Sequence, residues 1–553
     1  MSNKTTVACR PVATLMALCG LAPAIAISQQ IVLPVLPGQT PVQTAIGTAV
    51  ATMCVNALDA APNKPPPVLN SQQHDLHDQC HAIAGSVVTA AKGGGGAASA
   101  LGALTQVSGN EISTQGALAT RAVAGQFANI SGRLTALRFG GNLAVGGNRV
   151  AANDAGGQSV FTPLASAGAQ IPYRGTSMAD SYDQTGGFAS SFARYVPSQS
   201  QDGFIKAAFT SYDDDYAPRI VQSERSGGAS GASNPWGTFL QGSYTSGRHD
   251  ATSNEDPFHF HSASATAGVD YNFGTAVLGA SVGYDRFEAG FRASGANVSG
   301  GNAEVKSTSG SLYGAWFGEH WTFNGIATYG KLTTNVSRII HYTATYDTSK
   351  FADPQADLSD QCAGTICTVS VNRTLRGDPD GHILAVGATG GYQLSVDNWD
   401  IFPSLSVNYR RSTINSFTET DPNPPAGGDG LALAFNDQTV ESMRSILGLD
   451  LSRPVSVAFG VVTPIVRVEW DHEYKTSART IGAHYAFDPT AGSTCLSCFA
   501  LPTDGSPANY GIAGLGLSVT VARRVQAFLY DEALFGFANY HSNSVALGIR
   551  SQF

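Results

Sequence analysis

The chain has 553 residues, more than one ordinary globular domain usually contains. Only 13% of the residues are charged, 42% are hydrophobic and 62 are glycine, which fits neither a disordered chain nor a helical membrane protein. The formal net charge of -9 and the pI near 5.7 argue against nucleic acid as a partner.

The first 26 residues have the features of a secretory signal peptide. Lys4 and Arg10 form a basic start, an apolar stretch covers residues 12–21, and residues 24–26 match an A-x-A cleavage site. The apolar stretch is shorter than the ~20 residues that a spanning helix needs, and no later segment holds ~18 uninterrupted apolar residues. We therefore expect an exported chain whose mature part has no transmembrane helix.

Residues 27–139 are expected to form a small helical region. Residues 40–43 (Thr-Pro-Val-Gln) combine a capping box with proline at the first helical position. Two stripes of apolar residues at helical spacing follow, separated by the prolines at 65–67, and they carry Cys54 and Cys80 on their apolar faces. A disulfide between these cysteines would join an antiparallel pair of helices and contribute on the order of 3 kcal/mol.

Three histidines lie on one face of the second of these helices. His74, His77 and His81 are spaced by three and four residues, which would allow them to converge on one metal ion. This face is opposite to the apolar stripe through Leu76 and Ile83. We therefore favour a solvent-facing polar surface over a metal site.

From Trp236 onward, segments of about ten residues alternate apolar and polar side chains, as in transmembrane barrels. Near Val466, one face of a segment is apolar and the other face is charged. A water-filled barrel can line its lumen with stacked charged residues, whereas a soluble sheet would not readily do so. The charged face, which we assign to the barrel lumen, carries Arg467, Glu469, Asp471 and Glu473.

We therefore predict that residues 236–553 form a transmembrane antiparallel β-barrel of about 12 strands, preceded by the small α-helical region. Residues 140–235, rich in Gly, Ser, Ala and Asn, are expected to form a linker. The strands are expected to start near Trp236, His259, Ala276, Ala303, Trp321, His382, Ile401, Asp437, Val462, Tyr510, Val525 and His541.

Long and short connections alternate along this half, and the longest loop is expected from about Val336 to Gly381. Bacterial barrels have short periplasmic turns and long extracellular loops, so the parity places Trp236 and Phe553 at the periplasmic rim. The alternating last strand makes Phe553 a candidate membrane-insertion signal. Aromatic residues near the short turns predict an interfacial girdle that includes Trp321, Phe323, Trp399 and Phe402.

The cysteines suggest disulfides, because an even number of them follows the signal peptide in an exported chain. Fifteen connectivities are possible for six cysteines, so the pairing stays open. The C-x-x-C motif at residues 495–498 could be redox-active, but in an expected surface loop we favour a structural disulfide. The six candidates form three near pairs, Cys54 with Cys80, Cys362 with Cys367, and Cys495 with Cys498.

Residues 236–553 resemble the autotransporter β-domain, the translocator of type V secretion. The resemblance implies a twelve-stranded barrel in the outer membrane, a helical segment in its pore and a passenger before it. It also implies outer-membrane lipid, the Sec translocon, periplasmic chaperones and the barrel-assembly machinery as partners. The segments that carry it are ATAGVDYNF (265–273), LGASVGY (278–284), SLYGAWF (311–317), GGYQL (390–394), PIVRVEWDHEY (464–474), LGLSV (515–519) and GIRSQF (548–553).

The chain departs from the usual family plan, in which the pore helix directly precedes the first strand. Here the strongest helix ends about 95 residues earlier. Either residues 111–139 fill the pore or a weaker segment near residues 204–221 does, and the sequence leaves both possibilities open. In the first case, residues 140–235 must be accommodated on the periplasmic side.

The expected function is that of an outer-membrane translocator that anchors and displays or exports its own N-terminal region. The alternative is an outer-membrane pore or surface adhesin with a periplasmic helical domain. We expect no enzyme and no cofactor. Whether the N-terminal region lies at the cell surface or in the periplasm, what it binds and whether it is cleaved are not decided by the sequence.

Overall fold

The computed structural model describes residues 33–54, 58, 68–121, 123–140, 235–291, 300–351, 362–424, 428–521 and 525–552, all of which belong to one compact unit. The expected signal peptide, the alternative pore segment at 204–221 and the candidate insertion signal Phe553 lie outside these residues. Among the helices of the described ranges, none is both long and apolar enough to cross a membrane.

The first two helices of the described N-terminal region begin at capping residues. The Gln43 N–H donates to Thr40 Oγ1 at 3.2 Å, and Gln43 Oε1 accepts from the Thr40 N–H at 2.8 Å, which is a complete capping box. A second capping box, between Asn70 and Gln73, starts the next helix. The helices are α1 (Pro41–Met53), α2 (Ser71–Ala91), α3 (Ala97–Val107), α4 (Ile112–Arg121) and α5 (Ala124–Gly140).

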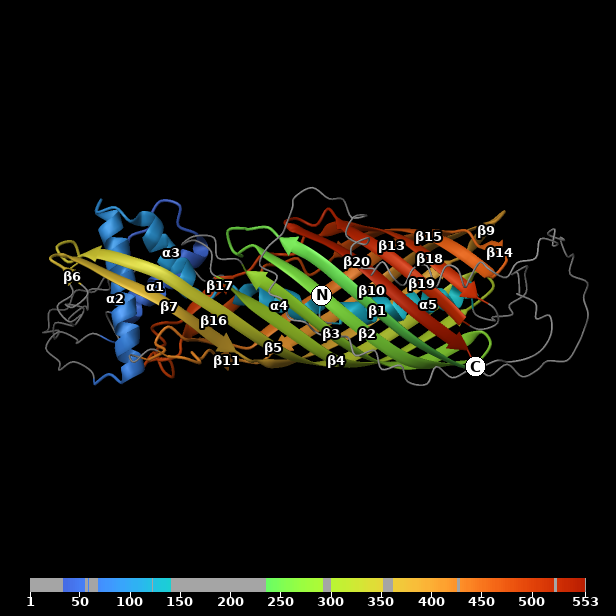
Figure 1. Cartoon of the computed structure of the whole chain (residues 1–553), viewed down its shortest axis with the longest axis horizontal. Coiled ribbons are helices and arrows are strands. Elements are labelled where there is room, and N and C mark those ends of the chain that lie inside the picture. Colours follow the sequence, from blue (N-terminus) through green and yellow to red (C-terminus); the bar gives the residue numbers. More distant parts are fainter. Residues whose placement is uncertain are drawn as a thin grey trace, which may run out of the picture. The chain divides into compact units, whose positions relative to one another are not determined.

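Twelve antiparallel strands close into a barrel, because β1 pairs with β2 on one side and with β20 on the other (Figure 1). The predicted fold is therefore confirmed, and each strand begins within three residues of its predicted start. In order around the barrel, the strands are β1 (Trp236–His249), β2 (Phe258–Asn272), β3 (Ala276–Phe291), β4 (Gly300–Phe317), β5 (Trp321–Asp347), β8 (Asp380–Tyr392), β10 (Trp399–Ile414), β13 (Gln438–Ser452), β15 (Gly460–Glu473), β18 (Asn509–Val521), β19 (Val525–Phe535) and β20 (Tyr540–Gln552).

Strand β5 continues well beyond the other strands as one arm of a long hairpin. It pairs with β8 up to Thr333 and then, in the same register, with β7 (Ile366–Gly377). The expected loop from Val336 to Gly381 is therefore wrong over most of its length. The physical reason is the period-two pattern of the segment, in which alternate residues from Val336 to Tyr346 are buried.

The loops after β10 and β15 form a second, four-stranded sheet of β11 (Phe417–Thr418), β12 (Leu433–Phe435), β16 (Thr480–Tyr485) and β17 (Phe499–Pro502). We call α1–α3, the hairpin extension (residues 334–347 and 366–378) and this sheet the cap. The remaining short strands, β6 (Cys362–Ala363), β9 (Leu394–Val396) and β14 (Val455–Val457), extend hairpins at the two ends of the barrel.

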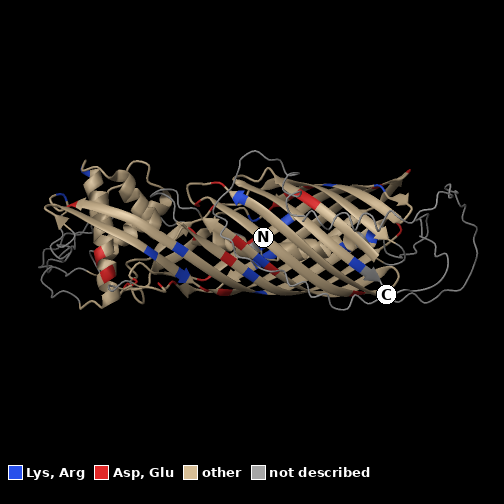
Figure 2. Ribbon diagram, in the orientation of Figure 1, with Lys and Arg blue, Asp and Glu red and all other residues tan. Residues whose placement is uncertain are grey.

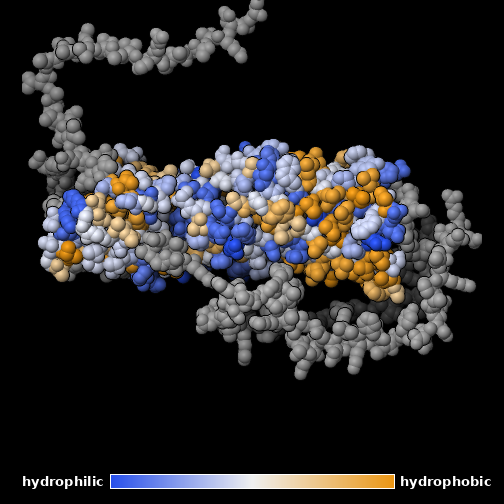
Figure 3. Space-filling model, turned by 90° about the horizontal axis from the view of Figure 1, so that it is seen from above, coloured by the Kyte–Doolittle hydropathy of each residue, from blue (hydrophilic) through white to orange (hydrophobic). Residues whose placement is uncertain are grey.

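The outer wall of the barrel is apolar, and its inner wall is polar. Val269 is 40% exposed on the outside, whereas its neighbour Asp270 is 3% exposed on the inside. Figure 3 shows hydrophobic residues gathered over one half of the barrel and a more polar surface on the half that carries the cap. Trp321, Phe323 and Trp399 face outward near the short turns, as a girdle would. Phe402 does not face outward. Its position in β10 differs in parity from that of Trp399, so its side chain points into the lumen.

Candidate functional site in the barrel lumen

The inner wall carries ion pairs between neighbouring strands. Arg467 of β15 donates from Nε to Asp450 Oδ1 of β13 at 2.6 Å, and Arg444 of β13 donates to Asp471 Oδ2 of β15 at 2.9 Å. Acidic and basic positions are interspersed along the strands (Figure 2). This part of the wall borders an internal cavity of about 770 Å³, whose lining includes Arg467, Glu469, Asp471 and Glu473.

Helix α5 lies inside the barrel and is fixed there by a buried ion pair. Arg133 donates from Nε to Asp270 Oδ2 at 2.8 Å and from Nη2 to Oδ1 at 2.7 Å. The two side chains are 1% and 2% exposed. The Tyr313 hydroxyl donates to the same carboxylate at 3.0 Å, and the guanidinium lies 5.5 Å from the Phe239 ring. Such a bidentate pair holds the helix in one position, because a shift would leave buried charges unpaired.

A second ion pair holds the C-terminal part of α5. Arg138 donates to Asp450 Oδ2 at 3.0 Å, and the same carboxylate accepts from Arg467. The Arg138 guanidinium also lies 3.6 Å from the centroid of the Phe402 ring, a cation–π geometry. Phe402 therefore helps to bind helix α5 from inside the barrel. It could not do so from the membrane girdle, where the sequence had placed it.

Glycines let α5 approach the wall closely on the side of β1–β3. A Cβ added to Gly125 would lie 2.4 Å from Ser264 Oγ, and one added to Gly132 would lie 2.7 Å from Gln241 Nε2. Between these glycines, Asn129 Nδ2 donates to Ser264 Oγ at 3.1 Å and to Thr266 Oγ1 at 2.9 Å. The helix therefore lies in close contact with side chains of the wall, and a larger side chain at Gly125 would push it away.

We expect Gly125→Val to destabilise the seated helix by about 1–3 kcal/mol, the usual cost of overpacking. Ala128→Val is the matched control, because Ala128 is exposed and faces the cavity, so the same side chain meets open space. The measurement is urea unfolding of the purified barrel in detergent. Equal midpoints for the two variants would contradict the close packing of α5.

The segment from α4 to α5 passes through the lumen from one end to the other. Gln438 Nε2 donates to Gln115 Oε1 at 3.2 Å, and Ser412 Oγ donates to the Ala119 carbonyl at 3.1 Å, both at the ends of β10 and β13 that lead into long loops. Arg138 lies near the opposite, short-turn ends. Of the two segments considered for the pore, the described part of residues 111–139 lies in the lumen, and residues 204–221 lie outside the described residues.

Sequence reasoning missed the residues that anchor this helix. The sequence did contain a signal for Arg133: it is a charged residue within the apolar stripe of a helix that has to be buried, so it needs a buried partner. The alternation of its segment places Asp270 on a polar face, but nothing local pairs it with Arg133, because the two residues lie 137 positions apart in the chain.

Two groups of described residues bring three potential metal ligands within 4.8 Å of one another. One consists of His249, Glu255 and Asp504 at the mouth of the barrel. Burial raises the pKa of Glu255 to about 7; the hydrogen bond from the Asp504 backbone N–H opposes this effect, the charge of the Asp504 side chain adds to it, and Arg479 opposes it. The other group is His484 with Cys495 and Cys498, whose thiols are joined in a disulfide.

Within the cap, polar contacts bind helix α2 to the hairpin extension and to the loop after β10. Asp75 accepts hydrogen bonds from both terminal nitrogens of Arg373 and from the Gly430 N–H, and the Tyr342 hydroxyl donates to Gln79 Oε1 at 3.0 Å. These contacts place the polar face of α2 against the protein and not in solvent.

The expectation of a solvent-facing histidine surface is therefore wrong for two of its three residues. His77 and His81 are 6% and 3% exposed, and their rings lie 4.4 Å apart. His81 also lies 6.1 Å from the Phe351 ring, next to the hairpin extension. The helix itself was predicted correctly from its spacing. That spacing does not reveal that another part of the protein covers the polar side of the helix.

The three expected cysteine pairs are disulfides in the structure. They join Cys54 with Cys80, Cys362 with Cys367, and Cys495 with Cys498. The first connects the end of α1 to α2, and the other two close turns of the cap. All three thus lie at the same end of the barrel, away from the short turns.

A closed barrel with an apolar outer wall, a charged inner wall and a helix through its lumen defines a plugged outer-membrane barrel. The family model described as "Autotransporter beta-domain" matches residues 238–530, and the chain belongs to this family. Its members are outer-membrane proteins, and export of their own passenger is their general function.

Solved structures of the same kind are similar to the chain. The translocator domain of autotransporter NalP from Neisseria meningitidis is 17% identical, with a TM-score of 0.40, and the match covers 58% of this chain and 90% of that one. The transport unit of the autotransporter AIDA-I from Escherichia coli is 15% identical, with a TM-score of 0.35, and the match covers 58% of this chain and 92% of that one.

A curated relative matches over a short range only. The "uncharacterized protein in trpE-trpG intergenic region" of Pseudomonas putida is 29% identical over 115 residues. This match covers 20% of the present chain and 18% of the relative, so the chain matches less than a fifth of the length of that protein.

Proposed function

We propose that the barrel anchors in the outer membrane and displays the helices α1–α3 at the cell surface, still connected to the barrel through α4 and α5. The observation that carries this proposal is the path of the chain. Helix α3 packs on the hairpin extension, where His341 donates its backbone N–H to Gln106 Oε1 at 3.0 Å. Helix α5 ends near the short turns at the other end, where Arg138 binds Asp450.

The orientation in the membrane follows from the lengths of the connections. Short turns are periplasmic and long loops extracellular in bacterial barrels, so the cap, which contains the long loops, lies outside. The proposed domains are a signal peptide (1–26), a helical region (27–139) that includes the displayed helices and the pore segment, a periplasmic linker (140–235) and the barrel (236–553). The Sec translocon, periplasmic chaperones and the barrel-assembly machinery are the proposed partners.

The N-terminal region is proposed to remain attached and docked. Its contacts with the hairpin extension include the buried ion pair of Asp75 with Arg373, whose side chains are both 7% exposed. A passenger that is released would not need such complementary contacts with its own barrel. This distinguishes the proposal from the alternative of a pore or adhesin whose helical domain stays in the periplasm, because a periplasmic domain cannot contact the outer end of the barrel.

The test is protease treatment of intact cells that carry one tag near Gly95 and another near Gly364. Both glycines lie in turns at positive φ, with open space around the Cα. We expect both tags to be lost. Loss of the Gly364 tag alone would place the helices in the periplasm and refute display, while protection of both would refute the orientation. A tag at the short turn near Gly274 is the control that should stay protected.

A further inference from the structure

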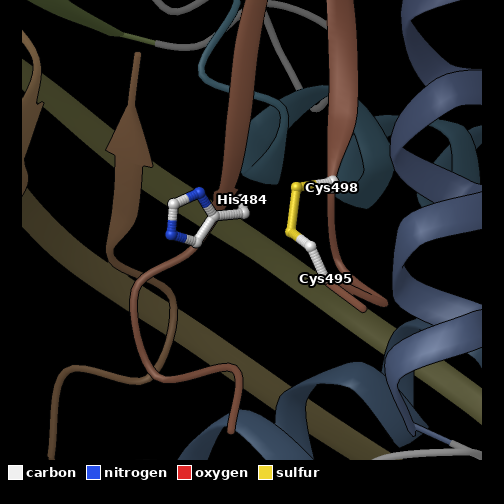
Figure 4. Close-up of side chains that lie close together, drawn as sticks. All are labelled: His484, Cys495 and Cys498. Carbon is white, nitrogen blue, oxygen red and sulfur yellow. A yellow bond between two sulfur atoms is a disulfide. The ribbon is translucent and has the colours of Figure 1, made fainter. Parts of the chain in front are cut away.

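The C-x-x-C disulfide of the cap lies beside a histidine of the neighbouring strand. Strands β16 and β17 are paired up to Ala483 and Phe499, and the next position in this register puts His484 opposite Cys498. One ring nitrogen of His484 and the sulfur atoms of Cys495 and Cys498 lie within 4.8 Å of one another (Figure 4). A histidine in this position can stabilise a thiolate that leaves the disulfide.

Among the disulfides that the described cysteines form, this is the one with an exposed cysteine. Cys498 is exposed, whereas Cys54 and Cys80 are each 1% exposed, and in the third pair Cys367 is fully buried and Cys362 is half-buried. Thiol–disulfide exchange requires that a thiolate reaches a sulfur atom of the disulfide, so burial protects the Cys54–Cys80 pair and restricts access to the third pair. Cys495 has a φ of 44°, a strained conformation for a residue other than glycine, and such strain is frequent at functional positions.

The loop that carries the disulfide is held by other contacts as well. The buried Asp488 carboxylate accepts from the Thr490 N–H at 2.7 Å and from the Ser497 N–H at 2.9 Å. Thr490 in turn accepts from the Cys495 N–H at 2.9 Å. Opening the disulfide therefore leaves both sulfur atoms close to each other and to His484, so that the reaction is reversible.

We propose that Cys495, Cys498 and His484 form a thiol–disulfide exchange site that reacts with thiols outside the cell. The thiolate of an external thiol attacks Cys498 Sγ, and a mixed disulfide forms as the Cys495–Cys498 bond breaks. The electron pair of that bond leaves on Cys495, whose thiolate is stabilised by the protonated His484 ring and then takes its proton. A second external thiolate releases the first as an organic disulfide, which completes a two-electron reduction of the pair.

The experiment uses the full-length protein in detergent micelles, incubated with glutathione or with a cysteine-containing peptide, quenched by alkylation and mapped by mass spectrometry. We expect adducts on Cys498 well before any reaction of Cys54 or Cys80. His484→Gln should slow the exchange about tenfold, because the thiolate that leaves on Cys495 loses the ring that stabilises it. The matched control is His320→Gln, an exposed histidine at a short turn, which should leave the rate unchanged.

The outcomes separate the sources of the thiol. Reaction with glutathione alone identifies small thiols, reaction with the peptide alone identifies polypeptide thiols, and either result supports the site. The proposal is overturned if Cys495 and Cys498 react no faster than Cys54 and Cys80, or if the two histidine variants behave alike. Exposure to the outside rests on the proposed function. Exchange in micelles but not on intact cells would therefore refute the orientation of the barrel and leave the site itself supported.

Discussion

Arg133→Ala is expected to destabilise the seated helix α5 by about 3–5 kcal/mol, the usual cost of removing one partner of a buried ion pair. The loss is large because Asp270 keeps its charge in a place where it is 3% exposed and where it loses the bidentate hydrogen bonds of Arg133, while the Tyr313 hydroxyl still donates to it. The barrel hydrogen bonds are untouched by the substitution, so the effect should be on the helix and not on the closure of the barrel.

Two measurements test this expectation. Conductance across planar bilayers should rise, because a helix that leaves its seat opens the lumen, and the urea midpoint of the purified protein should fall. Arg248→Ala is the matched control, since Arg248 pairs with Asp250 at 3.3 Å with both side chains about half exposed. An exposed pair of this kind contributes about 0–1 kcal/mol. Equal behaviour of the two variants would show that α5 is not fixed by Arg133.

A double variant separates the unpaired charge from the loss of packing. In Arg133→Met with Asp270→Leu, both charges are removed and replaced by apolar side chains of similar size. Buried ion pairs replaced in this way often leave stability unchanged or higher. We expect the double variant to recover most of the urea midpoint that Arg133→Ala loses. A double variant as unstable as the single one would point to packing as the cause.

The barrel could be predicted from the sequence because each of its strands has a local pattern that repeats. Val269 faces lipid and Asp270 faces the lumen, and this alternation needs no knowledge of any other strand. The lumen positions Arg467 and Asp471 follow from the same parity. Turn residues then set the starts of the strands, which is why these were accurate to a few residues.

What could not be predicted depends on contacts between distant segments. The burial of His77 and His81 depends on the hairpin extension, whose residues follow about 260 positions later in the chain. The inward position of Phe402 could have been predicted, because Leu405 lies on the outward, apolar face of the same strand and the two positions differ in parity. Phe402 was predicted to face the membrane because it is aromatic and lies near a short turn. The alternation of its strand predicts the opposite side, and that prediction is the correct one.

Arg338→Ala is expected to loosen the cap by about 3–5 kcal/mol, since it also removes one partner of a fully buried ion pair. Arg338 and Glu419 are each 1% exposed and form a bidentate pair. Arg338 further donates to the carbonyls of Gln106 at 3.1 Å and Leu431 at 3.2 Å. One side chain therefore joins the hairpin extension to helix α3 and to the loop after β10.

The loss should be confined to the cap, because β5 pairs with β8 of the barrel only up to Thr333, before the chain reaches Arg338. Hydrogen exchange should accelerate in α3 and around Leu433, whose N–H donates to Glu419 Oε2 at 3.0 Å, while the barrel strands keep their protection. Lys331→Ala on the same strand is the control, because Lys331 and Asp380 form an exposed pair. Glu419→Gln should be about as harmful as Arg338→Ala, since it leaves the guanidinium as an uncompensated buried charge. If the exchange changed equally in the cap and in the barrel, the two would unfold as one unit, and the docking of the N-terminal helices would not be a separate equilibrium.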